Sequence, residues 1–188
     1  MFINCKLLII TMLTELFKTE KRVEILNYVL YENKSSVTKV SRETGVSKGL
    51  VSRFIRYLES SGLIEKSGRS YYPKNIEKTK AIKVLLNLDK ININQLNLDW
   101  ADSIGIYGSW ASGTNTSESD FDVWVKVRKY PPEQEISRLN KDLRDTTKAE
   151  VSMLILTPKK LETLKNTDKP FYNSLLRNSI ILKGDTLE

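Results

Sequence analysis

Apolar positions recur at helical spacing through the first third of the chain. From Phe17 onward Val23, Leu26, Val29 and Leu30 share one side of a helical wheel, with charges on the other. Ser35-Ser36 and Ser47 are suitable N-caps, while Gly45 and Ser61-Gly62 are suitable stops. The pattern predicts three helices, over Phe17 to Tyr31, Val37 to Thr44 and Lys48 to Ser60.

The third predicted helix has an apolar stripe and a basic outer side. The stripe consists of Leu50, Val51, Phe54 and Leu58. The outer side consists of Lys48, Gly49, Ser52, Arg53 and Arg56. After this helix, two short runs rich in apolar and aromatic residues, 63–66 and 70–72, flank a turn at residues 67–69 and predict a β-hairpin.

The second half alternates between strand and helix patterns. A helix is predicted from Ile76 to Leu88, and the Asn-rich segment 89–102 is expected to form the junction and a first helix of a second domain. Strands are predicted at 104–107, 120–127, 149–156 and 180–182, and helices at 133–146, 159–164 and 170–177. The sequence therefore predicts an α+β protein with domains at residues 1–88 and 89–188, the second built on a mixed sheet.

Charge and composition narrow the functions. The chain has 188 residues with a formal net charge of +7, and residues 1–90 carry 17 Lys and Arg against 9 Asp and Glu. This basic first half favours a polyanionic partner. With no His and one Cys, the sequence excludes imidazole catalysis and a disulfide framework, so carboxylates must perform any acid–base chemistry.

The first eleven residues, Met1 to Thr11, are apolar around residues 7–10 but too few to span a bilayer. They are either the product of an upstream start codon or an N-terminal strand or dimer element. We expect a cytoplasmic protein without a membrane partner.

The segment from Gly108 to Asp122 carries the candidate chemistry. Asp120 and Asp122 are one residue apart on a predicted strand, so their side chains point to the same face. Two like charges held together are costly unless a cation lies between them, and oxygen ligands suit Mg²⁺. Gly108-Ser109 follows a short apolar strand and can present backbone N–H groups to phosphate at the start of a helix.

This arrangement of Gly-Ser, ten residues and Asp-x-Asp resembles the minimal nucleotidyltransferases of the DNA polymerase β superfamily, over roughly residues 96–182. The resemblance implies transfer of a nucleoside monophosphate from a nucleoside triphosphate, expected to be ATP, to an acceptor hydroxyl. It implies that Gly108 and Ser109 hold phosphates and that Asp120 and Asp122 hold one or two Mg²⁺ ions. A third catalytic carboxylate is expected from the next strand, where either Glu150 or Ser152 matches; we favour Glu150, and a match at Ser152 would leave that carboxylate missing.

The first domain resembles the winged helix-turn-helix regulators of bacteria and archaea. The resemblance implies binding of double-stranded DNA, with the face formed by Lys48, Ser52, Arg53 and Arg56 in the major groove and Arg69 at the wing tip. Winged helices also serve as protein-interaction modules. The helix at 76–88 is then either a dimer helix, which would make the protein a homodimer, or a spacer.

Two functions follow. The first is a Mg²⁺-dependent nucleotidyltransferase with a DNA-binding domain. A partner protein is one candidate for its acceptor. The second is a transcriptional regulator whose nucleotidyltransferase-like domain senses a nucleotide or a partner with little catalysis.

Overall fold

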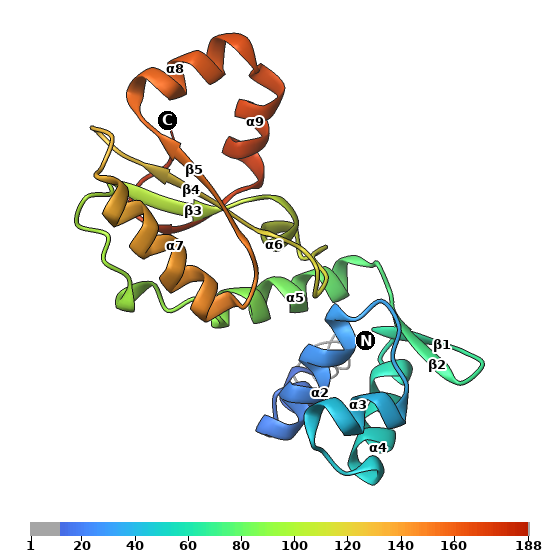
Figure 1. The fold of residues 1–188 in the computed structure, drawn as a ribbon. Coiled ribbons are helices and arrows are strands. Elements are labelled where there is room, and N and C mark those ends of the chain that lie inside the picture. Colours follow the sequence, from blue (N-terminus) through green and yellow to red (C-terminus); the bar gives the residue numbers. More distant parts are fainter. Residues whose placement is uncertain (1–11, 188) are drawn as a thin grey trace. The chain divides into compact units, whose positions relative to one another are not determined.

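The computed structural model describes residues 12–187 and divides the chain into two compact units, Met1–Thr79 and Lys80–Glu188. The first unit is helical with a small hairpin, and the second is built on a mixed sheet (Figure 1), which confirms the α+β prediction. The expectations for Met1 to Thr11 lie outside the described residues.

The first unit contains a short helical stretch at residues 12–16, followed by named helices and a two-stranded sheet. The named elements are α2 (Glu20–Tyr31), α3 (Val37–Thr44), α4 (Lys48–Ser60), β1 (Ile64–Ser67) and β2 (Ser70–Pro73). The bounds of α3 and α4 are those predicted. Local signals account for this at α3, because the Ser36 hydroxyl accepts a hydrogen bond from the Lys39 backbone N–H at 3.2 Å and Gly45 ends the helix at φ 68°.

Helices α2, α3 and α4 together form the core of the first unit. Leu26, Val29, Val51 and Leu58 are fully buried. The predicted stripe of α4 was wrong at one position: Leu50 is only half-buried, and Ile55 is buried in its place. The aromatic Phe54 remains in the stripe as predicted.

The predicted wing is present. Strands β1 and β2 pair antiparallel from Ile64↔Pro73 to Ser67↔Ser70, and Gly68 turns the chain at φ 59°. Ser35 and Tyr71 exchange two backbone hydrogen bonds of 2.9 Å, which attach the wing to the loop between α2 and α3.

Helix α5 (Glu77–Asp89) follows the hairpin, and the division of the chain falls inside it. The expected boundary after Leu88 lies later than the observed one. The reason is that α5 packs against the second unit from Lys80 onward: a Cβ atom on Gly113 would lie 2.2 Å from the Lys80 carbonyl oxygen. The side chain of Thr79, by contrast, donates to the Leu63 carbonyl of the first unit at 3.4 Å.

The second unit is a four-stranded sheet of order β5-β4-β3-β6, with β3 antiparallel to both neighbours and β4 parallel to β5. Its elements are η1 (Ile93–Gln95), β3 (Ser103–Ile106), α6 (Gly108–Ser112), β4 (Phe121–Lys126), α7 (Glu133–Thr147), β5 (Val151–Leu156), α8 (Pro158–Thr167), α9 (Lys169–Asn178) and β6 (Ile180–Lys183). The first helix expected within residues 89–102 is only the 3₁₀ turn η1, because the apolar residues there pack singly against the core instead of forming a helical stripe.

The two faces of the sheet bury different residues of β4. Phe121, Val123 and Val125 join the core beneath α6 and α7, while Trp124 joins a second cluster with Leu175 of α9. This alternation places Asp122 on the same face as Trp124 and turns Phe121 the other way, as predicted.

Candidate active site and nucleic-acid surface

The Gly-Ser turn begins α6 and lies against the acidic motif. Gly108 has φ 65°, a conformation that favours glycine, and a Cβ atom there would lie 2.4 Å from Asp122 Oδ2. The structure therefore brings the glycine of the turn and the second carboxylate together. Ser109 is half-buried, and its carbonyl accepts the backbone N–H groups of Thr114 and Asn115 at 3.0 and 3.2 Å.

The charges of the two aspartates interact, but their side chains differ in exposure to solvent. Asp120 directly precedes β4 and is exposed, whereas Asp122 is on the strand and half-buried. Burial and, secondly, the charge of Asp120 raise the pKa of Asp122, and a hydrogen bond from Ser152 lowers it in part. Burial is the larger cause of this raised pKa, and the like charge of Asp120 adds to it.

Ser152 is the cross-strand neighbour of Asp122. The register of the parallel pair β4–β5 aligns these two residues, and the Ser152 hydroxyl also interacts with Tyr107. Burial, followed by the charge of Asp122, raises the pKa of the Tyr107 phenol. Tyr107 is a site neighbour that the sequence reasoning did not identify, whereas Ser152 had been considered there as the alternative to Glu150.

Glu150 lies one position before β5 and has another partner. Its carboxylate accepts a hydrogen bond from Arg144 at 2.7 Å, and its side chain is 72% exposed. An exposed ion pair contributes at most about 1 kcal/mol, so Arg144 does not hold Glu150 firmly. The position beside Asp122 is occupied by Ser152, which is the alternative that leaves the third carboxylate missing.

Asp120 and Glu150 do share one feature. Both line an open hollow of about 480 Å³ whose other charged lining residues are Glu118, Arg144, Asp145 and Lys148. Within residues 12–187, no group of three or more acidic side chains is close enough to hold a metal ion together. The metal ligands expected from the sequence, Asp120 and Asp122, thus lie in the described region without a third acidic side chain beside them.

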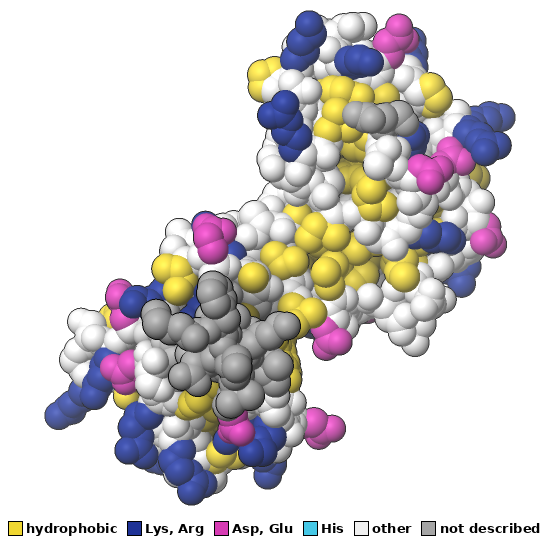
Figure 2. Space-filling model, turned by 180° about the vertical axis from the view of Figure 1, so that it is seen from behind, with side chains coloured by type: hydrophobic (Ala, Val, Ile, Leu, Met, Phe, Trp, Pro, Cys, Tyr) yellow, Lys and Arg dark blue, Asp and Glu magenta, His cyan; other side chains and the backbone are white. Residues whose placement is uncertain are grey.

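The basic face of α4 is exposed as predicted. Lys48, Arg53 and Arg56 are exposed, Ser52 is half-buried, and Arg69 is exposed at the turn of the wing. On the face of the first unit that Figure 2 shows, several Lys and Arg side chains project into solvent. The structure thus leaves the predicted DNA-contacting side chains open to a partner.

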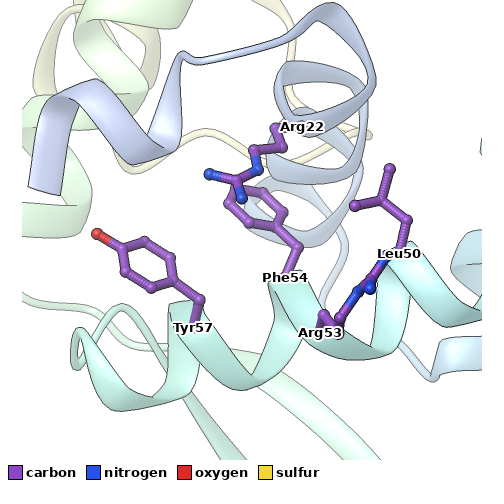
Figure 3. Close-up of a pocket in the computed structure, with 5 residues that line it drawn as sticks. All are labelled: Arg22, Leu50, Arg53, Phe54 and Tyr57. Carbon is purple, nitrogen blue, oxygen red and sulfur yellow. The ribbon is translucent and has the colours of Figure 1, made fainter.

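A shallow pocket of about 320 Å³ lies beside Arg53 (Figure 3). Phe54 stacks on Tyr57 with ring centroids 6.1 Å apart, and the Arg22 guanidinium lies 5.3 Å from the centre of the Phe54 ring. Arg22 also donates to the Glu15 backbone carbonyl at 2.8 Å and to the Glu15 carboxylate. Arg22 thus connects α2 to the helical stretch at residues 12–16 through Glu15 and to α4 through Phe54.

Two family models match the chain. The model described as bacterial regulatory protein, arsR family, matches residues 19–66, and the model described as nucleotidyltransferase domain matches residues 91–181. The chain joins a helix-turn-helix domain to a nucleotidyltransferase domain. The nucleotidyltransferase match contains the Gly-Ser turn, both aspartates and β5. A search of curated proteins returned no match.

Several solved structures of toxin–antitoxin proteins match part of the chain. A mutant of the toxin–antitoxin MntA-HpeT matches at 19% identity and TM-score 0.33, over 59% of this chain and 75% of that chain. A toxin–antitoxin crystal structure with AMP-PNP matches at 19% identity and TM-score 0.35, over 58% and 75%. A tri-AMPylated Shewanella oneidensis HEPN toxin in complex with MNT antitoxin matches at 12% and 0.33, over 56% and 73%. Matches this distant establish no shared activity.

None of the helices in the described part of the chain combines the length and the apolar composition that crossing a bilayer requires.

Proposed function

We propose that the protein is a Mg²⁺-dependent nucleotidyltransferase that moves a nucleoside monophosphate, expected to be AMP from ATP, to an acceptor hydroxyl. The observation that carries this proposal is the contact between the Gly108 turn and Asp122, beside Asp120, inside a nucleotidyltransferase domain. Phosphate-binding backbone and a cation-binding carboxylate pair are then adjacent, as phosphoryl chemistry needs.

Different residues of the site are proposed to bind the phosphates and the cation. Gly108 and Ser109 bind and orient the outer phosphates of the triphosphate, while Asp120 and Asp122 bind the divalent cation. When bound, Mg²⁺ neutralises charge on the phosphates and favours ionisation of the acceptor hydroxyl. The acceptor oxygen attacks the α-phosphorus, the bond from that phosphorus to the bridging oxygen breaks, and pyrophosphate leaves. Glu150, which lines the same hollow as Asp120, is the proposed base for the hydroxyl proton.

The helix-turn-helix domain is proposed to bind double-stranded DNA. Its exposed Lys48, Arg53 and Arg56 occupy the outer side of α4, and Arg69 extends from the wing. Phosphate contacts by these side chains would release counterions, so binding should weaken steeply as salt rises. A homodimer and a protein acceptor remain part of the proposal.

The test of the transfer activity uses ATP labelled at the α-phosphate. The purified protein is incubated with Mg²⁺ and labelled ATP, alone and with cell lysate, beside the double variant Asp120→Ala, Asp122→Ala. Label incorporated by the wild type and not by the variant supports the proposal and identifies the acceptor. No incorporation by a folded wild type in any of these conditions contradicts it.

One observation favours a second function. Ser152, not a carboxylate, is the neighbour of Asp122 on β5. A site with two carboxylates can bind a nucleotide with its cation and turn over slowly, which suits a regulator that senses a nucleotide through this domain. Nucleotide binding measured by calorimetry without label transfer, together with DNA binding that changes when ATP and Mg²⁺ are added, would support the regulator over the enzyme.

A further inference from the structure

A buried polar stripe on α5 faces the loop that joins the Gly-Ser turn to the aspartates. Asn87 and Asn115 are both fully inaccessible, and Lys83 is 6% exposed. Polar side chains buried to this degree are costly unless they are hydrogen-bonded. Their partners therefore show what the stripe does.

The stripe holds the loop at three points. The Asn87 side-chain amide donates to the Trp110 carbonyl at 2.8 Å and to Asn115 Oδ1 at 3.0 Å, and Asn115 Nδ2 donates back to Asn87 Oδ1 at 3.2 Å. The Lys83 ammonium donates to the Asn115 carbonyl. Side chains of α5 therefore donate hydrogen bonds to two carbonyls that the short helix α6 leaves without helical partners. These are the carbonyl of Trp110, in the last turn of α6, and that of Asn115, which follows it.

The backbone of α5 lies equally close. Gly113 has φ 68°, and any side chain there would collide with the Lys80 carbonyl. Lys80, Lys83 and Asn87 follow one another at three and four residues, so they lie on one side of the helix. One face of α5 is therefore built to receive residues 110–115.

The held loop lies between the two halves of the proposed site. Gly108 and Ser109 precede it, and Asp120 and Asp122 follow it. A displacement of about 1 Å in such a segment is enough to reduce a rate about a hundredfold, because reacting groups must meet within a narrow range of geometry.

We propose that Asn87 is a positioning residue of the site, which holds the Trp110–Asn115 loop so that the phosphate-binding turn and the aspartates keep their relative geometry. This inference rests on the proposed nucleotidyltransferase function. Asn87 touches neither nucleotide nor acceptor in this role and acts through the loop.

The test compares Asn87→Leu with Leu143→Ala, which removes a buried apolar side chain of α7 from the same core and leaves the hydrogen bonds between α5 and the loop in place. Both variants of the full chain are studied at a temperature at which each is fully folded. We expect Asn87→Leu to accelerate hydrogen exchange at the Thr114 and Asn115 amides, to raise the KM for ATP at least threefold and to lower kcat/KM at least tenfold. Leu143→Ala should reduce the melting temperature while leaving exchange at those amides, KM and kcat within twofold of the wild type.

Asn87→Gln serves as a partial rescue, because its amide keeps the donor and the acceptor of asparagine without adding a buried charge, while the longer side chain displaces them. Its exchange rates and kinetics should fall between those of the wild type and Asn87→Leu. Wild-type exchange at Thr114 and Asn115 in Asn87→Leu, or changes equal to those of Leu143→Ala, overturn the inference. A wild type that transfers no nucleotide defeats the proposed function instead, while the exchange data still decide whether Asn87 holds the loop.

Discussion

Gly108 and Asp122 are in contact across the start of α6: a Cβ atom on the glycine would lie 2.4 Å from the carboxylate oxygen Oδ2. The turn and the second aspartate are therefore mutually dependent. Gly108 also has φ 65°, so a side chain there would be strained even without the carboxylate.

Gly108→Ala should damage the site more than the fold. A left-handed conformation costs a residue with a side chain about 1–2 kcal/mol, and the methyl group must also displace Asp122. We expect a lower melting temperature and at least a tenfold loss of kcat/KM in the labelled-ATP assay. Gly49→Ala is the matched control, since its Cβ would meet nothing within 4 Å; it should leave transfer unchanged, and an active Gly108→Ala would disprove the contact.

Asp122→Asn should abolish transfer while stabilising the protein in the absence of divalent cations. Partial burial and the nearby charge of Asp120 raise the pKa of Asp122, so the ionised side chain is less favourable in the folded state than in the unfolded one at neutral pH. Removing the charge removes that penalty. Thermal unfolding in EDTA measures the effect, and added Mg²⁺ should raise the melting temperature of the wild type only. A variant less stable than the wild type in EDTA would contradict this.

Substitutions at Glu150 and Ser152 can decide which of the two positions matters for a third carboxylate. If Glu150 is the base, Glu150→Gln should lower kcat at least tenfold, while Ser152→Ala should have a small effect. If the position beside Asp122 is the one that matters, Ser152→Asp should raise transfer above the wild type and should make stability depend more strongly on Mg²⁺, because three carboxylates then surround one cation. Ser152→Asn controls for size, and kcat for each variant separates the two cases.

The sequence predicted well those elements whose signals are local. The bounds of α3 and α4 follow from adjacent caps and stops such as Ser36, Gly45 and Gly62, and the wing follows from its glycine turn. The acidic pair and the Gly-Ser turn are also local in the sequence. Their predicted convergence is supported by the contact between Gly108 and Asp122.

The features that the sequence did not reveal depend on distant partners. Strand register aligns Ser152 with Asp122, and no local pattern determines that alignment. The polar stripe of α5 reads as a solvated helix face in the sequence, because Lys83 and Asn87 are residue types that usually face water. Only the loop carbonyls supplied by another part of the chain explain their burial. Because of the same packing, the first compact unit ends at Thr79, before the boundary that the sequence predicted after Leu88.

Lys83→Met should change how stability depends on pH. Burial, with a smaller contribution from Lys90, lowers the pKa of Lys83 to about 8, whereas an unfolded chain keeps its lysine near 10.5. Between these values the unfolded state binds more protons, so the stability of the wild type should rise with pH in that window and should be flat below it. The wild type should gain up to about 3 kcal/mol relative to the variant from pH 8 to pH 10.5. Denaturant titrations at several pH values measure this, with Lys141→Met as an exposed control; curves that stay parallel would disprove the shift.

Arg53→Ala combined with Arg56→Ala should weaken DNA binding and leave nucleotide transfer intact. Both side chains are exposed on α4, outside the nucleotidyltransferase domain. Each lost phosphate contact should reduce the slope of log K against log salt by about 1, and a lost base contact should cost about 1–3 kcal/mol. Arg138→Ala with Lys141→Ala removes the same charge from α7 and should lower affinity only slightly. Fluorescence anisotropy with duplex DNA at several salt concentrations compares the variants, and equal losses in both pairs would show that net charge, and not the α4 face, governs binding.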